Sequence, residues 1–104
     1  MSWTVEYTNE FEDWWQTLEE KGPQLPFPFS SGIEKSKHSH MRELRVQSQS
    51  NPLRILYAFD PRRAAILLIG GNKRGNKRWY EIYVPLADKL YEEHLNELKK
   101  EKLL

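Results

Sequence analysis

Residues 41–69 constrain the fold most, because they contain three strand-like runs separated by short turns. Residues 41–47 alternate between polar and apolar side chains, residues 53–59 form a second run, and residues 64–69 are continuously apolar. The turn at residues 60–63 has proline in its second position, which tight turns favour. Strands joined this closely pair antiparallel, so we predict a three-stranded meander whose last strand is buried on both faces.

The N-terminal residues predict a short strand followed by a helix. Residues 3–7 alternate in polarity, and a helix is expected from Thr8 or Asn9 to a stop signal at residues 22–23. The apolar positions of this helix recur every three or four residues and are Phe11, Trp14, Trp15 and Leu18. Proline, glycine and serine are frequent in residues 22–40, where we expect a long irregular segment.

The C-terminal residues predict a second helix. Helical periodicity begins at Trp79, Pro85 is expected to break or restart the helix, and an apolar stripe continues to Leu98. The expected order is therefore strand, helix, loop, three strands and helix. We predict one α+β domain over residues 1–104, a small antiparallel sheet with an N-terminal helix and a C-terminal helix packed on one face.

Charge is distributed unevenly along the chain. The formal net charge is +1, but residues 35–78 hold eleven basic side chains against Glu43 and Asp60, a balance of +9. The flanking segments are acidic, at −6 before residue 35 and −2 after residue 78. A basic centre between acidic ends is typical of a protein that binds a polyanion.

Composition also excludes several classes of protein. Cysteine is absent, which excludes a disulfide framework and thiolate metal sites. The longest apolar run, residues 64–69, is much shorter than the roughly 20 residues of a membrane span. The N-terminus lacks a basic stretch followed by an apolar one, so no signal peptide is predicted. We expect a soluble cytoplasmic protein.

Cationic and aromatic side chains adjoin each other after the predicted meander. The loop at residues 72–78 is rich in lysine and arginine and leads directly into Trp79 and Tyr80. This combination suits single-stranded RNA better than duplex DNA. A solvated turn is the alternative interpretation of the loop.

Arginines on the predicted strands form a second cationic group. Arg42 and Arg54 have the parity of polar positions, so we expect them to share the exposed face of the sheet. Cross-strand cations repel unless an anion lies between them, which suggests a site for a bound anion. The alternative is that Glu43 and Asp60 neutralise the arginines.

His38 and His40 leave three interpretations open. Their spacing favours a metal pair only weakly, because no carboxylate or cysteine clusters beside them. One of them is a candidate general acid or base. The third interpretation is a solvated loop histidine.

Several strings of residues carry a family resemblance. They are Arg42-Glu43-Leu44-Arg45, Arg54-Ile55-Leu56-Tyr57-Ala58-Phe59-Asp60-Pro61-Arg62-Arg63, Gly70-Gly71-Asn72-Lys73, Trp79-Tyr80, Pro85-Leu86-Ala87-Asp88 and Leu90-Tyr91-Glu92-Glu93-His94-Leu95. Over most of its length the chain resembles the phage-derived HigB-like branch of the RelE/ParE toxin superfamily. The resemblance implies a type II toxin that cleaves mRNA, usually on the ribosome, and that a HigA-like helix-turn-helix antitoxin neutralises. It also implies that no metal or other cofactor takes part.

The resemblance implies roles for particular residues. Side chains that match catalytic positions of the family are Arg54, Lys73, Arg74, Tyr80 and Tyr83. Side chains expected to bind RNA around them are Lys37, His38, His40, Arg42, Arg45, Arg62, Arg63, Lys77, Arg78 and Trp79. In such a site a ribose 2′-hydroxyl attacks the adjacent phosphate, and the cations stabilise the developing negative charge.

The N-terminal region differs from the family pattern. Family members usually carry a second helix after the position of Glu20, whereas this sequence passes directly from the first predicted helix into a loop. The apolar surface left uncovered predicts a homodimer through the N-terminal helix, centred on Trp14 and Trp15. The alternative function is a non-catalytic RNA- or protein-binding module that keeps the RelE-like scaffold.

Overall fold

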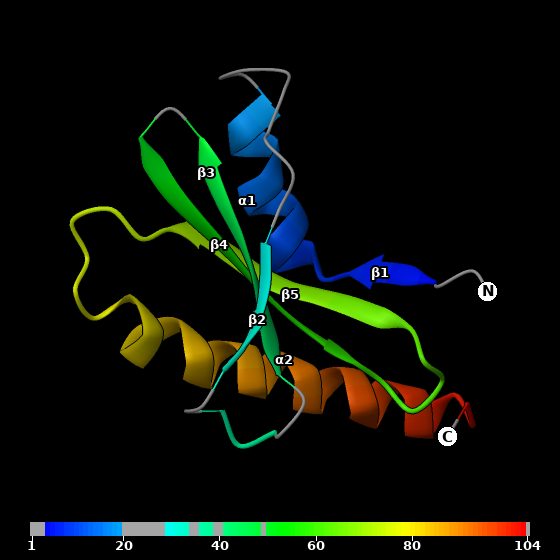
Figure 1. Cartoon of the computed structure of the whole chain (residues 1–104). Helices are drawn as coiled ribbons and strands as arrows, with labels where there is room; N and C mark the ends of the chain where they lie inside the picture. Colours follow the sequence, from blue (N-terminus) through cyan, green and yellow to red (C-terminus); the bar gives the residue numbers. More distant parts are fainter. Residues whose placement is uncertain (1–3, 20–28, 34–35, 39–40, 49, 104) are drawn as a thin grey trace.

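The computed structural model describes residues 4–19, 29–33, 36–38, 41–48 and 50–103. In chain order its elements are β1 (Val5–Tyr7), α1 (Asn9–Glu19), β2 (Phe29–Gly32), β3 (Arg42–Ser48), β4 (Asn51–Phe59), β5 (Ala65–Asn72) and α2 (Trp79–Lys100). The strands form one five-stranded sheet in the order β1-β5-β4-β3-β2 (Figure 1). β1 pairs parallel with β5 and all other neighbours pair antiparallel, so the predicted α+β class is confirmed.

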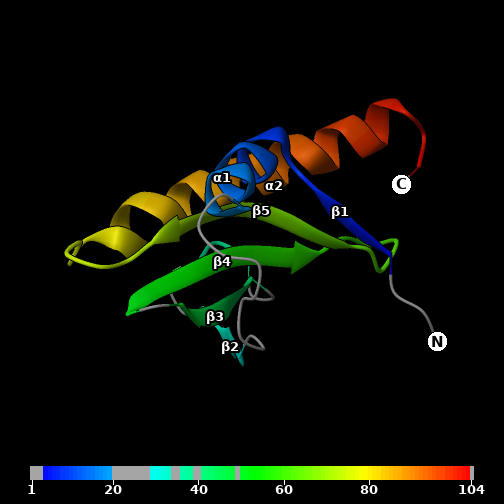
Figure 2. The same ribbon diagram turned by 90° about the horizontal axis from the view of Figure 1, so that it is seen from above.

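The predicted meander is present as β3, β4 and β5, and one strand was not predicted. Figure 2 shows β5, β4, β3 and β2 in succession across the sheet, with β1 beside β5. β2 lies inside the segment expected to be irregular, and its sequence of Phe-Ser-Ser-Gly is too short to show alternation. Pairing with β3 fixes its conformation, because strand formation depends more on neighbours than on intrinsic propensity.

The two helices cover opposite faces of the sheet, which corrects the expectation that both lie on one face. Successive strand residues point to opposite faces. A Cβ atom at Gly70 would overlap the indole of Trp14 on α1, whereas one at Gly71 would lie 2.8 Å from Nε1 of Trp79 on α2. Figure 1 shows the same arrangement, with α1 above β4 and β5 and α2 below them.

Each face of the sheet therefore has its own apolar core. The core facing α2 includes Leu56, Ala58, Ile66, Val84, Ala87 and Leu90. Because β4 residues alternate, Leu53 and Ile55 are buried on the other face, where Phe11 of α1 is also buried. The prediction that residues 64–69 are covered on both faces is confirmed by their burial.

The C-terminal helix α2 continues through Pro85, so the expected break at this residue is wrong. Proline has no N–H group and removes one hydrogen bond from the helix. Val84 and Ala87 on either side are buried against the sheet, and this packing maintains the helix. The lysines in its last turn add a favourable interaction with the helix dipole.

Buried Asp60 joins the turn between β4 and β5 to the second half of α2. Its carboxylate accepts backbone hydrogen bonds from Arg62 at 2.8 Å and Ala64 at 3.2 Å, and it pairs with the Arg62 guanidinium at 2.6 Å. Nε2 of His94 on α2 lies 3.0 Å from the same carboxylate. Burial by itself raises the pKa of Asp60, but the bonds from His94, Arg62 and Ala64 outweigh it, so the pKa lies below its ordinary value.

Buried Asp88 attaches the short segment of residues 36–38 to α2. It accepts hydrogen bonds from the Ser36 hydroxyl at 2.5 Å and from the backbone N–H of Lys37 at 3.0 Å. The ring of His38 packs edge-on against Tyr91, with ring centroids 4.8 Å apart. These contacts connect the segment between β2 and β3 to the helix.

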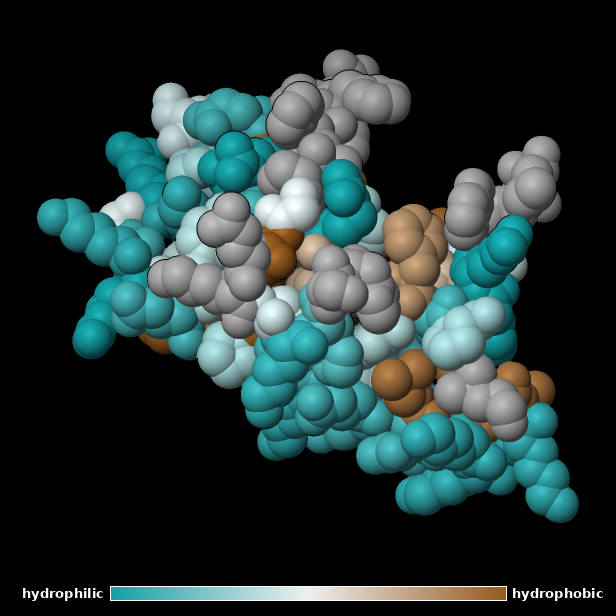
Figure 3. Space-filling view, turned by 60° about the horizontal axis from the view of Figure 1, so that its bottom comes forward, coloured by the Kyte–Doolittle hydropathy of each residue, from teal (hydrophilic) through white to brown (hydrophobic). Residues whose placement is uncertain are grey.

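The face of the molecule seen in Figure 3 is largely polar. In the view of Figure 3, hydrophilic residues cover most of the molecule and apolar residues form small separate areas. Within the described ranges, no helix has the length and apolar character needed to cross a membrane.

Candidate functional site

The register between β3 and β4 gathers three charged side chains on the sheet face that α2 covers. Arg45 pairs directly with Arg54, and Glu43 lies two residues earlier on β3, opposite Leu56. Residues two apart share a face of a strand, and Leu56 belongs to the core beneath α2. Tyr80, in the first turn of α2, completes the group.

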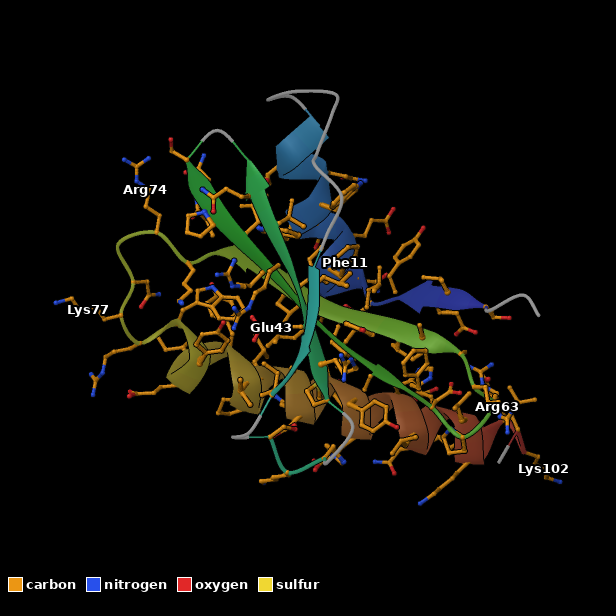
Figure 4. All side chains as sticks on the ribbon, viewed as in Figure 1. Phe11, Glu43, Arg63, Arg74, Lys77 and Lys102 are labelled. Carbon is orange, nitrogen blue, oxygen red and sulfur yellow. The ribbon has the colours of Figure 1, made fainter. Side chains whose placement is uncertain are left out.

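Glu43 is the centre of this group. Its buried Oε1 accepts a hydrogen bond from the Tyr80 hydroxyl at 2.6 Å and lies 3.2 Å from Nε of Arg45 and 3.3 Å from Nε of Arg54. The Arg54 side chain is 13% exposed and that of Arg45 is 48% exposed. Figure 4 shows Glu43 between the sheet and α2. The Arg54 side chain is therefore almost completely buried, whereas the Arg45 side chain is exposed to solvent.

The electrostatics of the group favour an anionic ligand. Burial and the hydrogen bond to Glu43 raise the pKa of Tyr80, so its hydroxyl remains a proton donor at neutral pH. The hydrogen bond and charge of Glu43 raise the pKa of Arg45. Nζ of Lys73 lies 5.0 Å from the centre of the Tyr80 ring, in cation–π range. Three cations against one carboxylate leave the group with a formal charge of +2.

A pocket of about 240 Å³ opens beside these side chains. It is lined by Gly32, Ile33, Glu43, Arg45, Lys73, Tyr80 and Val84. The lining combines elements distant in sequence, namely β2, β3, the end of β5 and the start of α2. Cationic side chains and a hydroxyl around a hollow of this size can hold a phosphate group and stabilise charge that develops on it.

Of the predicted catalytic residues, the fold brings Arg54, Lys73 and Tyr80 together. Arg74 is exposed in the loop between β5 and α2, and Figure 4 shows it pointing away from the pocket. Tyr83 stacks on Trp79 with ring centroids 4.6 Å apart and does not line the pocket. The geometry therefore favours Tyr80 over Tyr83 as the aromatic residue of the site.

The expected RNA-binding residues separate into distinct places. Arg45 lines the pocket, and Lys77 and Arg78 are exposed in the nearby basic loop, where Arg78 pairs with Glu81 at 3.1 Å. Trp79, which was expected to bind RNA, is buried in the core beneath α2 and presents almost no surface to a ligand. The indole fills the space over Gly71.

Arg42 is on the other face of the sheet. It pairs with Tyr57, so its side chain lies opposite to that of Arg54, and the expected shared face is wrong. Lys37 and His38 lie in the segment attached to α2 through Asp88, where Nε2 of His38 is 3.5 Å from a carboxylate oxygen of Glu92. His40 is outside the described residues.

Arg62 and Arg63 are far from the pocket. Arg62 pairs with Asp60 and, at 3.0 Å, with Glu6. Figure 4 shows Arg63 at the opposite end of the molecule from Arg74 and Lys77. RNA bound in the pocket would have to extend along the molecule to reach Arg62 and Arg63. The geometry therefore does not favour the predicted RNA contact of these two residues around the pocket.

The alternative that two acids neutralise the arginines is correct for three of them. Glu43 pairs with Arg45 and Arg54, and Asp60 pairs with Arg62. From the sequence, Glu43 was expected only as a counter-ion of the arginines and not as a residue of the site. Its position two residues before Arg45 on one strand was the available signal.

Comparisons with known proteins identify the family to which the chain belongs. Residues 4–92 match the family described as phage-derived protein Gp49-like, so the chain belongs to that family. It is 45% identical over 82 residues to "Putative toxin HigB2" of Mycobacterium tuberculosis, a match that covers 77% of this chain and 41% of that protein. It is 48% identical over 79 residues to "Putative toxin HigB3" of the same organism, covering 75% of this chain and 68% of the relative.

These matches confirm the predicted resemblance to HigB-like toxins. The chain spans less than half the length of the first of these relatives. A search of solved structures found no significant match.

Proposed function

We propose that the chain is the toxin of a type II toxin–antitoxin system and that it cleaves mRNA in the Glu43 pocket without a metal ion. The observation that carries this proposal is that Arg45, Lys73 and Tyr80 line one pocket together with Glu43, which in turn contacts Arg54 at 3.3 Å. Membership of the Gp49-like family and the names of the two relatives support the toxin assignment.

The proposed chemistry uses the RNA's own nucleophile. The ribose 2′-oxygen forms a bond to the adjacent phosphorus and loses its proton, while the bond from phosphorus to the 5′-oxygen breaks and that oxygen gains a proton. The products are a 2′,3′-cyclic phosphate and a 5′-hydroxyl end. Arg45 and Lys73 line the pocket and stabilise negative charge on the phosphate oxygens. Arg54, which contacts Glu43, adds positive charge beside the pocket.

The basic loop extends the site for a longer strand of RNA. Arg74 and Lys77 are exposed there and reach solvent beside the pocket. Cations of this kind follow the phosphate backbone without reading sequence. We propose that they hold single-stranded mRNA on the ribosome in the cytoplasm, and that a HigA-like antitoxin prevents this activity.

The homodimer predicted through the N-terminal helix remains a prediction. Trp14 and Trp15 are half-buried, and Trp14 packs over Gly70 within its own chain. Light scattering at micromolar concentration tests it, and a monomeric mass would contradict it. The predicted absence of a second helix after Glu20 concerns residues that lie outside those described.

A second candidate function is a non-catalytic binding module. The observation that favours it is that Arg45 and Arg54 already have a carboxylate partner, so their charges do not require a ligand. The two functions can be distinguished experimentally, because only an enzyme cleaves RNA.

Controlled expression tests the proposal. Induction of the wild-type chain should arrest growth, and Arg54→Gln should relieve the arrest, because loss of one donor from an anion site costs about 10²–10³ in rate. Lys89→Gln removes an exposed cation elsewhere on α2 and should remain toxic. The purified chain should cut mRNA bound to ribosomes. Folded Arg54→Gln that stays fully active would contradict the proposal.

A further inference from the structure

A second hollow lies at the opposite end of α2 from the Glu43 pocket. It has a volume of about 350 Å³ and lies between β1, the first turn of α1 and the C-terminal half of α2. The exposed Tyr7 lines it together with Ile66 and Leu90, whose side chains are buried. Figure 1 shows β1 at the edge of the sheet, far from the loop that connects β5 to α2. We call this hollow the β1 groove.

Among the described residues, the strand beside the groove, β1, pairs on one side only and forms an edge of the sheet. Ala65 N–H donates to the Thr4 carbonyl, and Thr8 N–H donates to the Leu67 carbonyl. Backbone groups alternate in direction along a strand, so those of Val5 and Tyr7 point away from β5. Val5 is 58% exposed and Tyr7 is 57% exposed. Exposed apolar side chains on an open sheet edge indicate an interaction surface.

The charge of the groove determines which partner fits it. Four glutamates line it, namely Glu6, Glu10, Glu93 and Glu97, together with His94, and no lysine or arginine among the described residues does. Arg62 pairs with Glu6 at 3.0 Å, and Lys100 lies 3.6 Å from Glu97. Within the described part of the chain, Glu10 and Glu93 have no ion-pair partner. The groove therefore keeps a negative charge that a cation can neutralise.

We propose that the β1 groove binds a lysine- and arginine-rich segment of a partner protein. Basic side chains of the segment face Glu10 and Glu93, and an apolar side chain packs against the exposed Tyr7. The inference rests on the proposed function, since a toxin needs an antitoxin. It assigns that partner a surface that leaves the Glu43 pocket open.

Other occupants fit the groove less well. A second copy of this chain packed groove to groove would bring the acidic first turn of α1, with Glu10 and Glu12, against the same acids. RNA is a polyanion and would be repelled by them. Both remain outcomes that the experiment below can detect.

The test uses a synthetic peptide of alternating lysine and valine with capped ends, titrated into the isotope-labelled full chain. Amide chemical shifts should change in β1, the first turn of α1 and the second half of α2. The Glu10→Gln/Glu93→Gln variant should bind more weakly, by about 2- to 5-fold for each carboxylate removed. Glu81→Gln removes an exposed carboxylate at the other end of α2 and should bind like the wild type.

Four outcomes would overturn the inference. They are absence of peptide binding, shift changes elsewhere on the molecule, equal binding of a peptide with glutamate in place of lysine, and equal binding by the Glu10→Gln/Glu93→Gln variant. Concentration-dependent shifts in the groove without peptide would assign it to a second copy of the chain. Shifts there on adding single-stranded RNA would assign it to nucleic acid.

The inference and the proposed function fail separately. If the chain arrests growth through Arg54 but does not bind the peptide, the proposed function stands and the proposed binding surface is rejected. A chain that binds the peptide in the groove but never cleaves RNA retains the surface and loses the function. Peptide binding by Arg54→Gln should equal that of the wild type, because the groove and the pocket are at opposite ends of α2.

Discussion

One buried carboxylate, Glu43, organises the cations of the candidate site. Two arginines opposite each other on adjacent strands repel when nothing lies between them. Oε1 of Glu43 contacts both guanidinium groups and also accepts a hydrogen bond from the Tyr80 hydroxyl, so the four side chains form one network. Members of such a network contribute to stability together rather than independently.

A double-mutant cycle between Glu43 and Tyr80 tests this coupling. Glu43→Gln and Tyr80→Phe each remove part of the 2.6 Å contact, so the double variant should lose less stability than the sum of the two. We expect a coupling of about 0.5–3 kcal/mol in urea unfolding. Arg45→Gln is the comparison, because its side chain is 48% exposed and should cost about 1 kcal/mol or less. Strict additivity would contradict a network.

Asp60 should make stability depend on pH in the acidic range. Its pKa lies below its ordinary value in the folded chain, whereas an unfolded aspartate titrates at about 3.9. The stabilisation is therefore complete above that value and is lost as pH falls through the folded pKa. Urea midpoints should fall on acidification, and Asp60→Asn, which keeps an acceptor for the backbone of Arg62 and Ala64, should flatten the dependence. An equally steep fall in the variant would show that other groups cause it.

At the scale of secondary structure, two adjacent glycines determine how closely the helices approach β5. Gly70→Ala would place a methyl group in the ring of Trp14, so α1 must shift. Overpacking of this kind costs about 1–3 kcal/mol, measurable by thermal or urea unfolding. Gly32→Ala is the matched control, because no atom lies within 4 Å of the added Cβ. If both variants are equally stable, the close contact between Trp14 and Gly70 does not limit the packing of α1.

The elements that sequence predicts well are those with strong local patterns. The three meander strands and both helices have clear periodicity, and the apolar run at residues 64–69 indicated burial on both faces. The strand β2 has no such pattern, because its pairing with β3 comes from tertiary contact. The placement of α1 and α2 on opposite faces depends on Gly70 and Gly71, whose directions become known only with the register.

Only part of the candidate site could be predicted from the sequence, because the rest depends on tertiary contacts. Arg54, Lys73 and Tyr80 came from the family resemblance, and the fold brings them together. Glu43 and the exclusion of Arg42 depend on which strand residues share a face, and this follows from the pairing of β3 with β4. The burial of Trp79 depends on how α2 lies over Gly71, which no local pattern reveals.

For the whole molecule, the two hollows lie toward opposite ends of α2 and differ in the charge of their lining residues. The Glu43 pocket and the basic loop lie near its N-terminal end, and the β1 groove with its four glutamates lies near its C-terminal end. This separation permits RNA and a basic protein partner to occupy different surfaces. An antitoxin in the groove would then act without filling the pocket, for example by keeping the toxin from the ribosome.

The most direct test of the central claim is a map of RNA ends in cells that express the chain. Attack by the 2′-hydroxyl leaves 5′-hydroxyl ends, so sequencing selective for these ends should find new ones within mRNA after induction. They should be absent with Arg54→Gln and present with Lys89→Gln. The claim would be contradicted if no such ends appear while growth stops, or if folded Arg54→Gln produces the same ends as the wild type.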